Sequence, residues 1–308
     1  KIKLLSRLIK KLNDEIYGIS ISDTLITKIL LGTLGCVPAY DKFFIIGIRQ
    51  AKLKYSKLSE SCFENHFQEL LKNETPTLVS LMHVNNETGV INDCKRIGEL
   101  CHENNVLFHC DTVQSIGKTE INLAELNIDF LVASAHKFHG PKGIGFAYVK
   151  KGFVLQPILF GGEQEKGWRA GTESVHQIAG MAKALELAYY HLEEERKYIE
   201  ELKSYCFEQL KANFSEVKQN GTITFYKILN VLLPFDEAKT AMILFNLDMK
   251  GIAVSRGSAC QSGSQKPSHV LAEMITGEDL KKPSLRISFS HYNTKEDIDI
   301  LISCLKEI

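Results

Sequence analysis

Short apolar runs alternate with helical segments from residue 77 onward, which predicts a sheet built from separate strands. We expect strands at residues 77–84, 106–110, 128–133 and 145–149. A helix is expected at residues 93–103, because Ile97, Leu100 and Cys101 recur at the spacing of one helical face. Apolar strands separated by helices favour a mostly parallel sheet covered on both faces.

Polar clusters follow three of these predicted strands. Asn85-Asn86-Glu87 follows the first strand, Asp111 follows the second, and Ser134 to Lys137 follow the third. Ligands of such sheets bind beyond the carboxyl ends of the strands. We therefore expect a ligand site where these polar side chains fall.

The pattern changes after a long predicted helix that runs from about Ser174 to past Glu200. Beyond Cys206 we expect strands at 231–233, 252–254 and 285–289 and helices at 239–247 and 295–305. The predicted fold class is α/β. A large domain with a mainly parallel sheet is expected at residues 1–205, and a smaller α+β domain is expected at residues 206–308.

The charge balance argues against some partners. Lysine and arginine together number 37, as do aspartate and glutamate, in a chain of 308 residues. A neutral total is untypical of a protein built to hold nucleic acid or a charged membrane surface. The best apolar run, residues 26–34, is interrupted by Lys28 and Gly32 and is too short to span a bilayer. We therefore expect neither a nucleic-acid nor a membrane partner.

The eight cysteines include no CxxC pair, so the spacing gives no zinc or redox motif, and no metal site is expected. A chain of this length does not need disulfides, and a reducing compartment fits best. We predict a cytoplasmic protein. The basic segment at residues 1–12, with leucines at helical spacing, leaves an organelle matrix as an alternative.

A lysine follows the third strand in Ser134-Ala135-His136-Lys137, and the chain then turns through Gly140 and Pro141. A cofactor aldehyde needs a lysine amine of lowered pKa to form a covalent bond. The hydroxyl of Ser134 and the imidazole of His136 can bind a phosphate beside that lysine. The alternative is a surface lysine in a polar turn.

Asp111-Thr112-Val113-Gln114 follows the second strand. A carboxylate at a strand end can pair with a protonated pyridine nitrogen, which keeps that ring an electron sink. Gln114 can hydrogen-bond a ring hydroxyl. The alternative is an aspartate that caps the N-terminus of a helix.

Three features lie further along the chain. A glycine-rich stretch at 161–173, which includes Thr172, approaches the long helix and suits an anion, or is a flexible loop. Cys260 stands in a small polar loop, where a thiol is more reactive than in a core, or is incidental there. Arg286 interrupts an apolar strand and needs a partner, which a substrate carboxylate or a structural ion pair would supply.

The motifs stand in this order: Met82-His83-Val84-Asn85-Asn86-Glu87-Thr88-Gly89, Asp111-Thr112-Val113-Gln114, Ser134-Ala135-His136-Lys137, Gly167-Trp168-Arg169-Ala170-Gly171-Thr172-Glu173 and Gly257-Ser258-Ala259-Cys260-Gln261-Ser262-Gly263. Together they resemble the motifs of the cysteine desulfurases that feed iron–sulfur cluster assembly. The resemblance runs from about Lys52 to the C-terminus. It implies a homodimeric, pyridoxal 5'-phosphate-dependent enzyme with the class V aminotransferase fold, which is a type I fold.

The resemblance also implies a role for each motif residue. Lys137 would hold the cofactor and act as a catalytic residue together with Cys260. The implied cofactor contacts are Asn86, Asp111, Gln114, Ser134, His136 and Thr172, the last reaching the phosphate of the other subunit's cofactor. Asn86 and Arg286 would bind the substrate, with Arg286 on its carboxylate.

The activity implied is the conversion of L-cysteine to L-alanine, with the sulfur left as a persulfide on Cys260. A sulfur-acceptor protein, such as an iron–sulfur scaffold, would then take the sulfur. The resemblance leaves a selenocysteine lyase-like enzyme as a second interpretation.

The part of the chain before Lys52 departs from the family pattern. Family members carry there a Gly-Thr phosphate cradle and a histidine that stacks on the cofactor ring. Gly32-Thr33 lacks the surrounding residues of that cradle, and His66 lies in an acidic, helix-like stretch. The N-terminal part is therefore expected to be divergent or missing. A third interpretation follows, namely a non-enzymatic homologue that serves as a dimerising or sulfur-relay partner.

Overall fold

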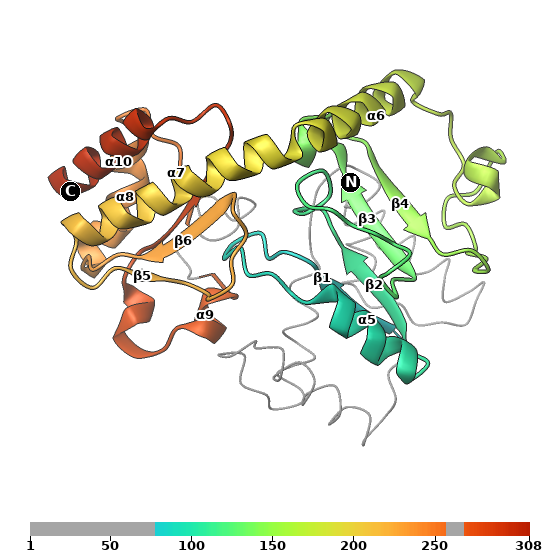
Figure 1. Ribbon diagram of the computed structural model, residues 1–308, viewed down its shortest axis with the longest axis horizontal. Coiled ribbons are helices and arrows are strands. Elements are labelled where there is room, and N and C mark those ends of the chain that lie inside the picture. Colours follow the sequence, from blue (N-terminus) through green and yellow to red (C-terminus); the bar gives the residue numbers. More distant parts are fainter. Residues whose placement is uncertain (1–77, 257–267) are drawn as a thin grey trace, which may run out of the picture.

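The computed structural model describes residues 78–256 and 268–308, which form two units, each with its own sheet (Figure 1). The N-terminal unit contains strands β1 (Leu78–Met82), β2 (Leu107–Asp111), β3 (Phe130–Ser134) and β4 (Gly145–Val149) in that order. The first three strands are parallel, and β4 runs antiparallel to β3. This mainly parallel sheet confirms the predicted fold class.

Helix α5 (Cys94–Glu103) covers one face of this sheet. It begins where the Asp93 side chain accepts a hydrogen bond from the Arg96 amide at 3.0 Å, and so satisfies an amide that the first helical turn leaves without a partner. Its apolar face and alternate strand residues form one buried cluster: Leu81, Ile97, Leu100, Cys101, Phe108, Cys110 and Leu131. The predicted helix at 93–103 is thus confirmed.

Helix α6 (Val175–Tyr190) packs against the carboxyl end of the same sheet. Met181 and Leu185 contact a buried cluster that includes Ala133 of β3 and Phe138 of the short 3-10 helix η1 (Ala135–Phe138). Ala133 and Leu131 lie two residues apart on β3, so α5 and α6 cover the same face. Within the described residues, coverage of the opposite face stays a prediction.

Strand β4 lies unusually close to β3 at Gly145. A Cβ atom on this residue would lie 2.2 Å from the carbonyl oxygen of Ala133, so only glycine fits without a shift of the backbone. This contact brings β4 against the end of β3, next to η1. A second 3-10 helix, η2 (Gln164–Gly167), follows in the loop that leads to α6.

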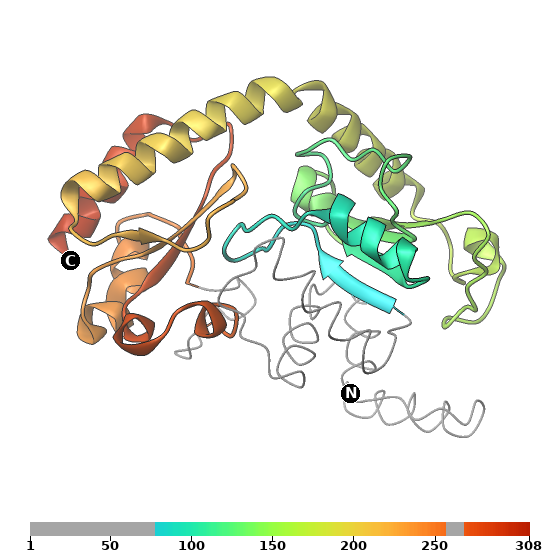
Figure 2. The ribbon, with the colours of Figure 1, turned by 60° about the horizontal axis from the view of Figure 1, so that its bottom comes forward.

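Two helices stand where the sequence predicted one. Helix α6 ends at Tyr190, and α7 (Leu192–Asn213) begins after His191, whose ψ of 5° departs from helical geometry. The two helices form an arch across both units (Figure 2). The apolar face of α6 contacts the N-terminal unit, whereas Leu202 and Leu210 of α7 contact the other core. Because of this break, one continuous pattern of apolar residues packs against two separate cores.

The C-terminal unit is built on an antiparallel sheet of three strands. These are β5 (Lys218–Gln219), β6 (Ile228–Leu232) and β7 (Ser284–Ser288), in the order β5-β6-β7. All five residues of β6 are buried. The described residues of this unit also form α8 (Glu237–Asp248), α9 (Leu271–Met274), the 3-10 helix η4 (Gly277–Lys281) and α10 (Lys295–Glu307).

One predicted strand is wrong. Residues 252–254 form no strand, and only Ser255 pairs with Arg286, in an isolated bridge. The chain leaves α8 through a turn in which Gly251 has a φ of 77°. The chain therefore meets the edge of β7 only at Ser255, where it makes a single bridge.

The core of the C-terminal unit lies between its sheet and the helices. Leu229 and Val231 of β6 pack against Leu202 of α7 and Leu301 of α10, and all four are buried. Each such side chain contributes about 1.5–3 kcal/mol when it leaves water. Helix α10 begins with a capping box between Thr294 and Asp297.

The division of the chain at residues 205 and 206 stays a prediction. Helix α7 runs without a break through this point, and its buried residues from Ile199 to Leu210 all belong to the C-terminal core. No helix in the described part of the chain is long and apolar enough to cross a membrane.

Candidate active site

Asp111 is the last residue of β2, at the carboxyl end of the parallel strands. Its Oδ1 atom accepts a hydrogen bond from the Val113 amide at 2.9 Å, which fixes the carboxyl group against the following turn. Burial raises the pKa of Asp111, while the Val113 amide and the positive charge of Lys137 lower that pKa. The carboxyl group therefore lies within electrostatic reach of Lys137.

Ser134 ends the neighbouring strand β3, and its Oγ atom lies 2.8 Å from Nδ1 of His136. Burial lowers the pKa of His136, and the positive charges of Lys137, Lys142 and Lys118 lower it further. A hydroxyl and an imidazole thus meet at a strand end where cations surround them. This combination suits an oxyanion such as phosphate.

Lys137 lies in η1, the 3-10 helix that begins directly after Ser134. The 3-10 helix ends at His139, whose φ of 67° lies in the left-handed region, and the chain then turns away. The charge of Lys137 acts on Asp111, His136 and Lys118. The structure therefore gathers the predicted lysine, carboxylate, hydroxyl and imidazole at adjacent strand ends.

Gln114 lies in the turn after β2, and its carbonyl oxygen accepts a hydrogen bond from Nζ of Lys118 at 3.2 Å. Sequence reasoning missed Lys118, whose amine is buried. Burial lowers the pKa of Lys118 to about 7, together with the charges of Lys227 and Lys137. A lysine between Gly117 and Thr119 is typical of a surface turn, so the sequence carries no signal of this burial.

Arg286 lies in the middle of β7 and reaches the N-terminal unit. Its Nη1 atom donates to the carbonyl oxygen of Asn86 at 2.9 Å, and its Nη2 atom donates to Oγ of Ser255 at 3.3 Å. The structure thus brings together two residues predicted to bind the substrate, although they are 200 positions apart. Both of these acceptors are neutral.

The turn that carries Asn86 is buried against the C-terminal unit. Asn230 of β6 donates to the carbonyl oxygen of Glu87 at 2.8 Å, and the amide of Phe225 donates to the carbonyl oxygen of Gly89 at 2.7 Å. Gly89 has a φ of 76°, and a Cβ atom there would lie 3.0 Å from Cβ of Ile228. We call residues 85–89 the interdomain turn.

Glu87 is a second residue that the sequence analysis left without a role. Its side chain is fully buried in the interdomain turn. One carboxyl oxygen accepts a hydrogen bond from Oγ of Ser268, and the other has no hydrogen-bond partner among the described residues. A glutamate in a polar Asn-Asn-Glu run would be expected at the surface, because its burial depends on a unit encoded much later in the chain.

An ion-pair group joins the long helix to the C-terminal unit. Glu195 of α7 lies 3.8 Å from Nζ of Lys227 and 3.0 Å from Nδ1 of His291. The His291 ring centroid lies 5.8 Å from that of His139, which ends η1. This group therefore connects the lysine-bearing helix of the candidate site with the second unit.

Two predicted residues lie apart from this cluster. Thr172 is exposed in the loop between η2 and α6, where Arg169 pairs with Glu165 and Glu173 at 3.5 and 3.4 Å. Cys260 lies outside the described residues, as do Gly32, Thr33 and His66. The roles of all the predicted site residues stay predictions.

The groups at the strand ends fit pyridoxal 5'-phosphate. The buried Asp111 carboxyl suits a protonated ring nitrogen, and the Ser134–His136 pair suits the phosphate. Lys137 supplies the amine for the aldehyde. These groups suit the ring nitrogen, the phosphate and the aldehyde of the cofactor.

Comparisons with known proteins identify the family of the chain. Residues 48–301 match the sequence model of the family described as Aminotransferase class-V. The cysteine desulfurase IscS of Clostridium botulinum is 41% identical over 261 residues, which cover 83% of this chain and 66% of that protein. The cysteine desulfurase IscS of Dictyoglomus turgidum is 39% identical over 231 residues, which cover 75% and 59%.

Solved structures show the same relationship. The X-ray structure of a NifS-like protein from Rickettsia africae superposes with a TM-score of 0.70 at 34% identity, over 79% of this chain and 65% of that one. The apo cysteine desulfurase of Thermococcus onnurineus shares the fold with a TM-score of 0.70, at 19% identity, over 99% and 84%.

The chain therefore belongs to the class-V aminotransferase family. Within that family it is a relative of the IscS cysteine desulfurases and of a NifS-like protein, as the motifs indicated. The chain spans about two thirds or less of the length of the curated relatives described above.

Proposed function

We propose that the protein is a cysteine desulfurase, which converts L-cysteine to L-alanine and leaves the sulfur as a persulfide on Cys260. The observation that carries the proposal is the gathering of Asp111, Ser134, His136 and Lys137 at adjacent strand ends. The IscS-type relatives support the same activity.

Pyridoxal 5'-phosphate, when bound, forms a covalent bond with an amine and accepts negative charge from the substrate's α-carbon. Asp111 pairs with its ring nitrogen in this proposal, and Gln114 and Asn86 contact its ring hydroxyl and the substrate. Ser134 and His136 hold its phosphate. A low-pKa imidazole in this place donates or accepts hydrogen bonds without adding a full charge.

Lys137 removes the proton from the α-carbon of cysteine through its freed Nζ amine. Arg286 orients the substrate through its carboxylate. The Cys260 thiolate attacks the substrate sulfur, so that an S–S bond forms and the C–S bond breaks. The electron pair of the broken bond stays with the β-carbon, which takes up a proton and becomes the methyl group of alanine, and Lys137 returns a proton to the α-carbon. The substrate sulfur is left bound to Cys260.

The proposed partners follow from the same reaction. A persulfide needs an acceptor, and the IscS relatives favour an iron–sulfur scaffold protein for that role. We also propose a homodimer in which Thr172 reaches the cofactor phosphate of the second subunit. Large apolar side chains are exposed near Thr172, which supports a covered surface there: Val154, Ile158, Phe160 and Val175. A reducing compartment, the cytoplasm, completes the proposal.

The test is alanine release from L-cysteine with a reductant present to remove the persulfide. We expect Cys260→Ala to abolish this release while the visible absorption of the bound cofactor remains. The matched control is Cys304→Ala, which changes a buried thiol of α10 and should leave the rate within about twofold. Lys137→Ala should abolish both the absorption and the release.

Two outcomes would refute the proposal. A full rate in Cys260→Ala would mean that another group accepts the sulfur. An absence of visible absorption after incubation with pyridoxal phosphate would mean that the strand-end cluster does not hold the cofactor, and the non-enzymatic interpretation would then replace the enzymatic one.

A further inference from the structure

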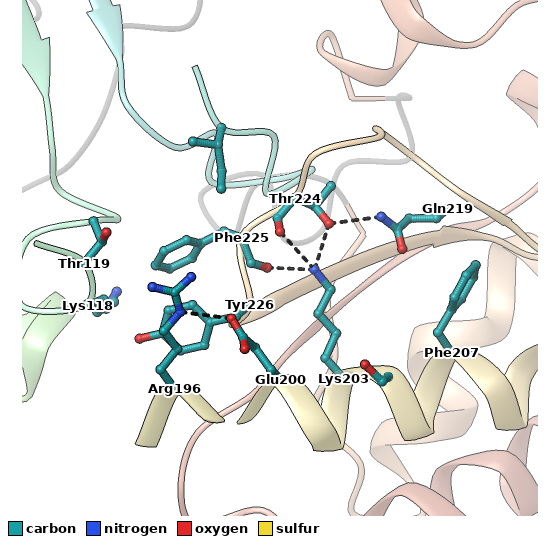
Figure 3. A pocket seen from close by; sticks show the side chains of 12 residues that line it. Lys118, Thr119, Arg196, Glu200, Lys203, Phe207, Gln219, Thr224, Phe225 and Tyr226 are labelled. Atoms are coloured by element: carbon teal, nitrogen blue, oxygen red, sulfur yellow. Dashed lines mark hydrogen bonds and ion pairs between the residues drawn. The ribbon is translucent and has the colours of Figure 1, made fainter. Parts of the chain in front are cut away.

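A cavity of about 410 Å³ lies between the two units, on the side of helix α7 (Figure 3). The N-terminal unit contributes Lys118 and Thr119 to its wall. That unit also contributes Ile91, and the remaining wall comes from α7, from Gln219 of β5 and from the chain between β5 and β6, which includes Phe225 and Tyr226. The volume lies in the range of small-molecule sites, which is about 300–1,000 Å³.

The cavity is not the candidate active site. Its lining residues include none of those predicted to bind the cofactor or the substrate. The cavity and the candidate active site are nevertheless neighbours, because Nζ of Lys118 in the cavity wall donates to the carbonyl oxygen of Gln114 at 3.2 Å. A ligand in the cavity would therefore lie behind the turn that follows β2.

Three basic side chains and one carboxylate line the cavity: Lys118, Arg196, Lys203 and Glu200. The Lys203 amine already has partners within the protein, because its Nζ atom donates to Oγ1 of Thr224 at 2.7 Å and to the carbonyl oxygen of Phe225 at 2.8 Å. Lys118 and Arg196 each make a single hydrogen bond among the described residues, which leaves most of their donors available.

Arg196 is placed to bind an anion in this cavity. Its Nε atom donates to Glu200 at 2.9 Å, so the two Nη atoms remain for a ligand. The guanidinium carbon lies 6.0 Å from the centre of the Tyr226 ring. Figure 3 shows the guanidinium beside Tyr226, on the side of the cavity where Lys118 and Thr119 lie. A planar guanidinium with two free Nη groups matches a carboxylate or phosphate in bidentate geometry.

The wall also has an apolar part, beside four neutral polar side chains: Thr119, Ser204, Gln219 and Thr224. Phe207, Phe225 and the ring of Tyr226 line the cavity, together with Ile91 from the N-terminal unit. A bare inorganic ion would leave these rings uncovered, whereas an anion with an apolar body would fill the space. Apolar rings combined with polar and charged groups that can orient a ligand are typical of small-molecule sites.

We propose that this cavity binds a small organic anion, whose phosphate or carboxylate group lies between Arg196 and Lys118 and whose apolar body contacts Phe225 and Tyr226. The ligand links the two units, because Lys118 belongs to the N-terminal unit and Arg196 to the helix that carries the C-terminal core. The ligand lies next to the turn that follows Asp111 and contains Gln114. Its binding would therefore connect that turn with α7.

The test uses phenyl phosphate as the probe and ligand-observed NMR as the measurement. The full chain is first saturated with pyridoxal phosphate and the unbound excess is then removed, so that the cofactor's own phosphate site is filled and no free pyridoxal phosphate competes with the probe. We expect one phenyl phosphate per chain, with a dissociation constant of about 1 mM or tighter. Inorganic phosphate should compete more weakly, and phenol should not bind.

Arg196→Gln should weaken phenyl phosphate binding at least about tenfold, because it removes charge-assisted hydrogen bonds. Arg196→Lys, which keeps the charge, should lose less. The matched control is Lys197→Gln, which removes the same charge from the next residue of α7, outside the cavity wall, and should change the constant less than twofold. Arg196 is exposed, so these variants should fold as the parent does.

The proposal is overturned if phenyl phosphate does not bind, or if Arg196→Gln and Lys197→Gln bind it equally. Substitution of phenylacetate for the probe distinguishes a carboxylate site from a phosphate site, and tighter binding of either supports the proposal. The readout is binding alone. A chain that failed every desulfurase assay would still pass or fail this test on its own terms.

Discussion

The hydrogen bond from Ser268 to Glu87 can be tested by the substitution Ser268→Ala. Ser268 is buried, and its Oγ atom donates to the carboxyl group of the fully buried Glu87. The same oxygen accepts hydrogen bonds from the amides of Val270 and Leu271, at 3.1 and 3.2 Å. Alanine would therefore remove one donor and one acceptor from a site without access to water.

The expected cost can be worked out from these contacts. A hydrogen bond to a charged group contributes about 1.5–3 kcal/mol. An acceptor for amides at the start of a helix contributes about 0.5–2 kcal/mol. Because the two share one oxygen and do not add fully, we expect Ser268→Ala to lower the free energy of unfolding by about 2–4 kcal/mol.

The chain offers a matched control in Ser284→Ala. Ser284 is buried to the same extent, but its Oγ atom accepts a hydrogen bond from a neutral group, Nδ2 of Asn220, at 3.2 Å. A neutral hydrogen bond contributes about 0.5–1.5 kcal/mol. Ser268→Ala should therefore cost clearly more than Ser284→Ala.

Urea denaturation followed by circular dichroism measures both free energies, with the slopes compared to check that the same surface unfolds. A cost of Ser268→Ala no larger than that of Ser284→Ala would refute the reasoning, because the charged acceptor would then contribute nothing extra. Repeating Ser268→Ala in a Glu87→Gln background should reduce its cost, since the acceptor there is a neutral amide.

Three further predictions concern charge, chemistry and assembly. Lys118 has a pKa of about 7 in the folded chain against an ordinary value of 10.5, so the unfolded chain binds more protons between these two pH values. The free energy of unfolding should therefore rise with pH in this range, by up to about 1.4 kcal/mol per pH unit. Urea midpoints at pH 7, 8 and 9 should rise less steeply in Lys118→Met, and an unchanged slope would contradict the low pKa of Lys118. Asp111→Asn should keep the visible absorption of bound cofactor but lower alanine release by about 100-fold or more, as expected when one partner of a buried charge pair is lost, and a near-normal rate would exclude the pairing. Phe160→Asp should turn a dimer into a monomer in light scattering, whereas a parent chain that is already monomeric would refute the proposed assembly.

Much of the fold follows from local patterns. The strand at 145–149 and the helix at 93–103 are found within one residue of their predicted positions, because apolar periodicity and an N-terminal Asp93 determine them locally. The break at His191 could not be predicted in this way. The apolar positions continue across it, and only the presence of two separate cores makes the helix divide there.

The candidate site shows the same limit. Asp111, Ser134 and Lys137 were predicted because polar residues at the ends of apolar strands meet at one edge of a parallel sheet. Glu87 and Lys118 were not, because each is a charged residue in a turn, where exposure is the usual outcome. Their burial depends on the second unit and on packing between segments more than a hundred residues apart.

The interdomain turn has a consequence for the order in which the newly made chain can fold. Asn86 accepts a hydrogen bond from Arg286, which is synthesised 200 residues later, and Glu87 accepts one from Ser268, which is synthesised 181 residues later. At a synthesis rate of about 5–20 residues per second, the carboxyl group of Glu87 stays in water for roughly 10–40 s after it leaves the ribosome. The N-terminal sheet can form in that interval, but the edge that holds the turn cannot be completed until Ser268 and Arg286 have emerged. During that interval the candidate site has its strand ends but lacks the residues that bury its turn.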